Sequence, residues 1–363
     1  MILEHVRLFA DDMPLSDYRV TLSNLCLVNH MFREECQSRL FQTLHYSGNT
    51  RFAQRTRIRV WKDLIKADDP RATLIASWVS ECTFSDWYRE ELSRAGWDHT
   101  VFRDAVLETA AQFCNLKAIT LCVCPLIPGV PAVLAQMKQV RTVVLDACFV
   151  VGPLATEHLG FPGKFWTSLT VRNVQNLGNL IPAIVHLVDI DDLHSLSTDS
   201  QSLIISLFSN RPAPKLKYLR IASPNSPGSH THDTRSFSSI LVNTPNLTCL
   251  HWHSSQEPST EIAPTIVPKL EELTAETHTV GRLIHRRPIT SLHLLGPIIP
   301  ELPFFRDVDV AARIRKLVIP MSALNRIGLD IFPALEAITL LNPRCAKRQA
   351  QHIDVRSSHS MKS

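Results

Sequence analysis

The chain has 363 residues, of which 45% are hydrophobic and 20% are charged, and its formal net charge is +4. At about 150 residues per domain this length predicts one to three domains, and the composition excludes a wholly disordered chain. The small charge argues against nucleic acid or an anionic membrane as the partner, and only 11 glycines, without a phosphate-binding glycine motif, argue against a nucleotide-binding enzyme.

The first 47 residues have apolar spacings that predict helices. Leu3 and Val6 belong to a short first helix, which Pro14 and the polar residues around it interrupt. Residues 21–41 predict a second helix, because apolar side chains recur there at intervals of three and four residues. The first stripe consists of Leu22, Leu25, Val28 and Phe32, and a second stripe of Cys36, Leu40 and Phe41 follows it. We therefore expect a small all-α segment over residues 1–47.

Residues 48–112 have no regular pattern over most of their length. Helical spacings occur over residues 61–66 and 101–113. Four of the six tryptophans lie in this region, at Trp61, Trp78, Trp87 and Trp97. Aromatic residues at such intervals belong more often to a core than to a ligand-binding cage. We expect this region to form irregular first repeats.

A repeated apolar pattern extends over residues 113–344. Each copy places apolar side chains at its first, fourth and sixth positions, and successive copies follow at intervals of about 19 to 31 residues. These offsets are typical of a short strand that buries alternate side chains, preceded by a turn that buries one more. The copies begin at Leu116, Val140, Trp166, Val185, Leu216, Leu247, Leu270, Ile289, Ile314 and Leu335. Two looser copies begin at Phe41 and Val79.

Residues 213–221, 244–252 and 332–340 follow the pattern P-x-L-x-x-L-x-L, with other apolar residues at some leucine positions. This pattern resembles that of leucine-rich-repeat proteins. The resemblance implies an α/β solenoid with a parallel β-sheet on its concave face and helices and loops on its convex face. An ordinary α/β domain with several strands is the alternative. Residues 345–363 lack apolar periodicity and are expected to form a disordered tail.

Residues 25–32, with the sequence LCLVNHMF, and the following Leu40 and Phe41 resemble the second half of an F-box, whose usual opening Leu-Pro-x-Glu is missing here. An F-box followed by leucine-rich repeats is a familiar pairing. The resemblance implies a substrate-receptor subunit of an SCF-type (Skp–cullin–F-box) ubiquitin ligase, in which the F-box binds a Skp-type adaptor and the repeats bind a protein target. The adaptor-binding residues would be Leu3, Val6, Leu22, Leu25, Val28 and Phe32. The alternatives are a plain helical cap on the first repeat and a repeat scaffold with no ligase role.

The side chains next to the middle apolar residue of each copy point away from the core, so we expect them to line the concave face. Their charges are mixed in sign, which predicts a protein target rather than a nucleic acid. The predicted target-binding residues are Arg172, Asp189, Asp191, Arg220, His251, His253, Glu272, Glu276, His293 and Lys316.

His251 and His253 alternate along one predicted strand, so both imidazoles lie on one face, where His293 could supply a third metal ligand. The preferred interpretation is that these histidines hydrogen-bond to a partner, and we expect no metal. Cys122 and Cys124 lack a second close pair of cysteines, so they form only a weak zinc pattern. No G-x-S-x-G or H-E-x-x-H motif occurs. We therefore expect no catalytic residue, no cofactor and no enzymatic activity.

The nine cysteines are irregularly spaced, and no basic-then-apolar leader opens the chain. Both features predict free thiols in a reducing compartment. We expect an intracellular protein, cytoplasmic or nuclear, that is not secreted. No apolar run approaches the roughly 18 residues that a membrane helix needs, so no membrane partner is expected.

Overall fold

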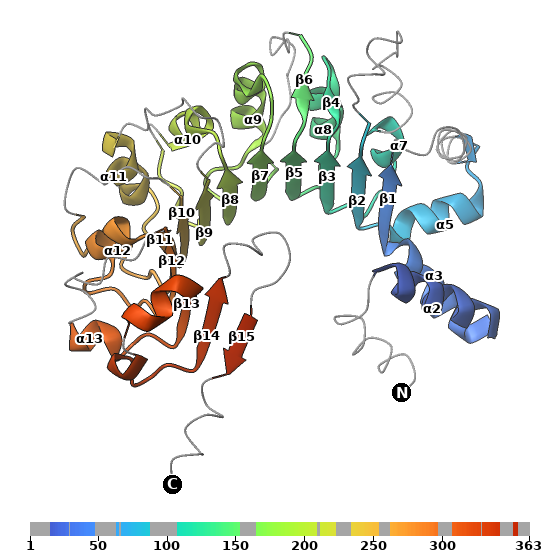
Figure 1. The fold of residues 1–363 in the computed structure, drawn as a ribbon. Helices are drawn as coiled ribbons and strands as arrows, with labels where there is room; N and C mark the ends of the chain where they lie inside the picture. Colours follow the sequence, from blue (N-terminus) through green and yellow to red (C-terminus); the bar gives the residue numbers. More distant parts are fainter. Residues whose placement is uncertain are drawn as a thin grey trace. The chain divides into compact units, whose positions relative to one another are not determined.

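The computed structural model describes residues 15–28, 30–47, 63–64, 67–87, 107–152, 165–208, 211–222, 234–253, 262–296, 307–327, 329–341 and 351–354. The chain divides into two compact units. The first unit is Met1–Phe165 with Val174–Leu187, and the second unit is Trp166–Asn173 with Val188–Ser363. In each, short parallel strands alternate with helices and loops (Figure 1). No helix in the described ranges is long and apolar enough to cross a membrane.

The first unit begins with two helices, α2 (Leu15–Val28) and α3 (His30–Gln42). A single helix over residues 21–41 was predicted, and the structure differs by breaking it. A continuous helix would hold Leu22 and Cys36 about 21 Å apart, whereas two packed helices bring them into one small core. That core consists of the buried Leu22, Cys26 and Cys36, with Leu25 and Leu40 packed against it.

A parallel sheet follows in the first unit. Its strands are β1 (Thr43–Ser47), β2 (Glu81–Ser85), β3 (Ala118–Cys122) and β5 (Thr142–Asp146). The register aligns Leu44, Cys82, Ile119 and Val143. Both looser copies of the repeat are therefore strands. The helical segment expected over residues 1–47 ends at Gln42, and the remaining residues are held in β1 by pairing with β2.

Short helices and a minor sheet complete the first unit. They are α5 (Pro70–Trp78), α7 (Glu108–Ala110), β4 (Pro125–Leu126), α8 (Val130–Gln136), β6 (Phe149–Val150), η2 (Leu177–Asn179) and α9 (Ile181–Leu187). Asp69 caps α5 by accepting hydrogen bonds from two backbone N–H groups, and Pro70 occupies the first turn. Trp87 is buried, and its Nε1 donates to the carbonyl oxygen of Tyr46 at 3.1 Å, as expected for a core aromatic. Trp61 and Trp97 lie outside the described residues. Of the two segments with helical spacings, residues 61–62, 65–66 and 101–106 also lie outside them.

The second unit contains a longer sheet. Its strands are β7 (Ser168–Arg172), β8 (Ser195–Thr198), β9 (Tyr218–Ile221), β10 (Cys249–Trp252), β11 (Glu272–Glu276), β12 (Ser291–Leu295), β13 (Lys316–Pro320), β14 (Ala337–Leu341) and β15 (Gln351–Asp354). Strands β7 to β14 pair in parallel in chain order, and β15 runs antiparallel to β14. Residues 345–363 were expected to lack structure. Four of them form β15, and the others lie outside the described residues.

A ladder of buried aliphatic residues runs across this sheet. Its members are Leu169, Leu196, Leu219, Leu250, Leu273, Leu292, Leu317 and Ile338, which the register places side by side. Burying each of them contributes about 1.5–3 kcal/mol. The helices of the unit are α10 (Gln201–Phe208), α11 (Thr234–Val242), α12 (Thr277–Leu283), α13 (Val308–Ala311), η4 (Met321–Arg326) and η5 (Leu329–Ile331). Parallel strands that alternate with helices and share one leucine ladder confirm the leucine-rich-repeat architecture.

One predicted copy of the repeat is misplaced. The strand expected from Val185, Val188 and Ile190 does not form: residues Ile181–Leu187 are helix α9, and Val188 makes only an isolated bridge to Trp166. The strand lies further on, in β8. The prediction failed because a helix with buried residues at intervals of three and four can also satisfy the offsets of the repeat.

Candidate functional site

The sheet of the second unit has one face that carries no buried ladder, and we call it the open face. Along each strand the side chains alternate, so residues next to a ladder leucine point to this face. Its middle row consists of Ser197, Arg220, His251, Thr274, His293, Val318 and Thr339, which the register aligns. The structure therefore brings Arg220, His251 and His293 into one row, as the repeat pattern predicted. Their role in binding a target stays a prediction.

Other predicted residues flank this row on the open face. Glu272 and Lys316 begin their strands and are exposed, in the row that also holds Tyr218 and Cys249. On the other side, Arg172 and Glu276 end their strands and His253 follows β10; all three are partly exposed. The open face is thus mixed in charge.

Asp189 and Asp191 do not belong to the open face, and their prediction as concave-face residues is wrong. They lie in the turn between α9 and β8, because the strand they were assigned to is a helix. The neighbouring Asp192 forms an ion pair with Lys215. The open-face residues of β8 are instead two serines, and Arg172 donates from Nε and Nη2 to the hydroxyl of Ser197 at 3.1 and 2.8 Å.

The histidines of the open face are neutral at physiological pH. Partial burial lowers the pKa of His251 and His253 below the usual 6.5. The Arg220 guanidinium acts in the same direction on both, whereas the Glu272 carboxylate partly opposes the shift at His251. The pKa of His293 falls to about 4, chiefly through burial and then through the two other imidazoles. A neutral imidazole has one nitrogen that donates and one that accepts, so each ring can hydrogen-bond a neutral polar group.

Two buried polar atoms on the open face lack a hydrogen-bond partner within the described part of the chain. They are Nε of Arg220 and Nε2 of His293. A buried polar group without a partner costs about 1–3 kcal/mol. A bound molecule that supplies an acceptor to Arg220 would recover part of that cost.

A compact group of side chains with metal-binding chemistry lies beside this row. The thiol of Cys249, an imidazole nitrogen of His251 and a carboxylate oxygen of Glu272 all lie within 4.8 Å of one another. Nε2 of His251 is 3.6 Å from Oε1 of Glu272, and the Tyr218 ring lies against His251 with centroids 5.3 Å apart. Burial and the Glu272 carboxylate raise the pKa of Cys249 to about 12. It is the one group of this kind among the described residues.

Sequence reasoning missed this group because it combined His251 with the wrong residues. His253 and His293 were considered as co-ligands, whereas Cys249 and Glu272 face each other across β10 and β11. The contact between Cys249 and Glu272 depends on the register between the two strands, which cannot be read from the sequence. One signal was available: Cys249 and Glu272 hold the same position, three residues before the last core residue of their copies.

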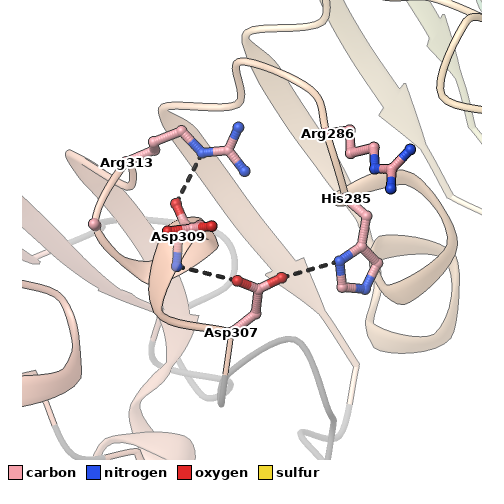
Figure 2. A pocket seen from close by; sticks show the side chains of 6 residues that line it. His285, Arg286, Asp307, Asp309 and Arg313 are labelled. Carbon is pink, nitrogen blue, oxygen red and sulfur yellow. Dashed lines mark hydrogen bonds and ion pairs between the residues drawn. The ribbon is translucent and has the colours of Figure 1, made fainter.

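A cavity of about 710 Å³ lies elsewhere on the second unit, between the segment that follows α12 and the residues in and around α13 (Figure 2). Nδ1 of His285 is 3.2 Å from Oδ2 of Asp307, whose Oδ1 accepts from the backbone N–H of Asp309 at 3.0 Å. Arg313 donates from Nε to the carbonyl oxygen of Asp309 at 2.9 Å. Asp307 therefore serves as the N-cap of α13, and its contact with His285 joins the start of this helix to the segment that follows α12.

The residues predicted to bind an adaptor have different environments. Leu22 is fully buried in the core of the helix pair and Leu25 is half-buried against it, so both stabilise the helix pair. Their role in adaptor binding stays a prediction. Val28 is 65% exposed, and Val20 and Leu27 are exposed by 58% and 80%. Leu3 and Val6 lie outside the described residues, as does the side chain of Phe32, whose backbone belongs to α3.

No protein-family model and no curated protein matches the sequence. Among solved structures, an internalin from Listeria monocytogenes str. 4b F2365 is similar to this chain, with 13% sequence identity and a TM-score of 0.34. The match covers 64% of this chain and 83% of the internalin. A likeness this distant carries no argument about function. The repeat architecture rests on the registered strands of the chain itself.

Proposed function

We propose that this chain is a protein-binding leucine-rich-repeat protein, without enzymatic activity, that holds its target on the open face of the second unit. The observation that carries this proposal is the pair of buried, unpartnered atoms there, Nε of Arg220 and Nε2 of His293. Around them lie exposed charges of both signs, Glu272 and Lys316 among them. Such a surface suits a folded or extended protein segment better than a polyanion.

The finer proposal is that the chain is the target receptor of an SCF-type ubiquitin ligase and binds a Skp-type adaptor through α2. Two observations support it: the resemblance of residues 25–32 to an F-box, and the exposed apolar side chains of Val20, Leu27 and Val28. Exposed apolar residues clustered on one helix favour an interaction surface. An intracellular location, cytoplasmic or nuclear, belongs to this proposal.

A repeat scaffold without a ligase role is the second candidate, and one specific contact favours it. The helix α3 packs on α5 and β1, and the rings of Phe41 and Trp78 stack with centroids 6.4 Å apart. Helix α3 thus covers the first repeat, which is the task of a terminal cap. Binding of the adaptor separates the two candidates.

Site-specific photo-crosslinking in cells tests the binding face. A photoreactive amino acid placed at Lys316 or Glu276 reports on the open face, and the same group at Ile205 or Val242 reports on exposed helix positions as the matched control. We expect a discrete crosslinked protein from the open-face positions alone, identified by mass spectrometry. Crosslinks from the helix positions alone, or from no position, would overturn the assignment.

A further inference from the structure

The group formed by Cys249, His251 and Glu272 has the geometry of an incomplete tetrahedral metal site. In such a site zinc lies about 2.3 Å from sulfur and about 2.0–2.2 Å from nitrogen or oxygen, which places the donor atoms roughly 3.3–3.6 Å apart. His251 and Glu272 already satisfy this spacing, with Nε2 and Oε1 3.6 Å apart. The largest separation within the group is under 4.8 Å. An adjustment of about 1 Å therefore completes the triangle.

The positions of the three residues make that adjustment small. Cys249 and His251 are two residues apart on β10, so both side chains point to the open face, and the register places Glu272 directly beside Cys249. The strands hold the thiol and the imidazole in place. Glu272 already contacts His251, and because it is exposed its side chain has room to rotate toward a bound ion.

We propose that Cys249, His251 and Glu272 bind one zinc ion through the thiolate sulfur, the imidazole Nε2 and a carboxylate oxygen. The set combines the three donor types that zinc takes in proteins, and a thiolate disfavours magnesium and calcium. Binding breaks the S–H bond of Cys249, forms an S–Zn bond, and releases the proton to solvent. Three protein ligands leave one coordination position for water or for a donor group of another molecule.

The ion would join β10 and β11 on the open face. With the Cys249 thiolate and the Glu272 carboxylate as ligands the loaded site is neutral, so binding would remove the negative charge of Glu272 from the open face. This proposal does not depend on a protein target or on an adaptor, because the three ligands belong to the chain itself.

Titration of the full-length chain with zinc and with cobalt tests the site. The chain is first reduced and freed of metal with a chelator. We expect about one equivalent of zinc to bind in calorimetry. Cobalt should give the near-ultraviolet absorption of a thiolate–cobalt bond and the strong visible bands of a tetrahedral ion, and zinc should displace it.

Variants assign the signal to these residues. Cys249→Ser should remove the thiolate–cobalt absorption and weaken zinc binding on the order of 100-fold or more, since loss even of a residue supporting a ligand costs 10–100-fold. Glu272→Gln, at an exposed position that tolerates substitution, should weaken zinc binding at least about tenfold. Cys114→Ser, which changes an exposed cysteine outside the group, is the control and should leave both signals unchanged.

Three outcomes would overturn the proposal. They are the absence of a thiolate–cobalt band in the wild type, its persistence in Cys249→Ser, and unchanged zinc affinity in Glu272→Gln. Because Cys249 is partly buried, far-ultraviolet circular dichroism of the metal-free variant must match the wild type. If Cys249→Ser does not fold, Glu272→Gln decides the outcome alone.

Discussion

Nε2 of His251 lies 3.6 Å from Oε1 of Glu272, although the two residues belong to different repeats. The parallel register of β10 and β11 brings them together by pairing Cys249 with Glu272 and His251 with Thr274. A shift of one residue in this register would move Glu272 to the buried face and bring Glu271 or Leu273 into its place. The site on the open face therefore depends on the leucine ladder on the opposite face.

The ladder should be the main source of stability in the second unit. Leu250 is fully buried between Leu219 and Leu273, so Leu250→Ala should lower the free energy of unfolding by about 2–5 kcal/mol. The exposed Val242 is the control, and Val242→Ala should change the free energy of unfolding by less than about 0.5 kcal/mol. Urea denaturation followed by circular dichroism measures both. Equal effects of the two substitutions would place Leu250 outside the core.

Arg287 should matter for stability in spite of its charge. Its side chain is buried, and its guanidinium donates to five backbone carbonyl oxygens, those of Ile262, Ala263, Ile266, Leu283 and His285. Arg287→Met would leave these acceptors without the guanidinium and should cost roughly 3 kcal/mol or more. Arg287→Lys should also be less stable than the wild type, because an ammonium group cannot reproduce the planar arrangement of N–H donors in a guanidinium group.

The adjacent Arg286 supplies the control for this prediction. It is exposed, so Arg286→Met should change the unfolding free energy by less than about 0.5 kcal/mol. Thermal unfolding of the three variants measures the difference. Full stability of Arg287→Met would show that solvent or a local rearrangement satisfies the carbonyl groups equally well.

The cysteines should differ sharply in reactivity. Burial raises the pKa of Cys148 to about 12, and its thiol donates to the carbonyl oxygen of Leu121 at 3.2 Å. At pH 8 this thiol is protonated and therefore unreactive, whereas Cys114 is exposed. Brief alkylation of the native chain with iodoacetamide at pH 8 should modify Cys114 and spare Cys148, as measured by peptide mass spectrometry. Equal labelling of both in the folded chain would contradict the burial of Cys148.

Acid should destabilise the second unit in part through His293. Its pKa is about 4 in the folded chain and about 6.5 in the unfolded chain, so the unfolded state binds more protons between these values. Stability from this group is complete above pH 6.5 and falls as the pH decreases toward 4. His293→Gln should therefore show a smaller loss of melting temperature between pH 6.5 and 4.5 than the wild type. An equal loss of melting temperature in the two proteins over that pH range would refute the contribution of His293.

The strands of the repeats could largely be predicted from the sequence, because the spacing of apolar residues in each copy identifies the side chains that its strand buries. Leu219, Leu250 and Leu292 were placed correctly on this basis alone. The pattern failed at Val185, where helical and repeat spacings coincide, and Asp189 and Asp191 were misplaced with it. Errors of this kind arise because a short apolar run satisfies two periodicities at once.

The contacts that carry chemistry were harder to predict. The open-face row followed from alternation along a strand, but the approach of Cys249 to Glu272 required the register between strands. Arg287 gave no signal at all, since an arginine surrounded by backbone carbonyl groups has no sequence pattern. The exposure of Leu27 beside the buried Cys26 likewise depends on how α2 packs against α3.

Calorimetric titration of the full-length chain with a purified Skp-type adaptor tests the proposed receptor role most directly. We expect saturable binding by the wild type. Leu27→Asp combined with Val28→Asp should weaken it at least about tenfold, because each buried aliphatic side chain contributes about 1.5–3 kcal/mol. Ile205→Asp combined with Val242→Asp, at exposed positions of the second unit, should leave the affinity unchanged. No binding by the wild type, or equal binding by the Leu27 and Val28 variant, would contradict the receptor role and favour a scaffold whose helix pair only caps the first repeat.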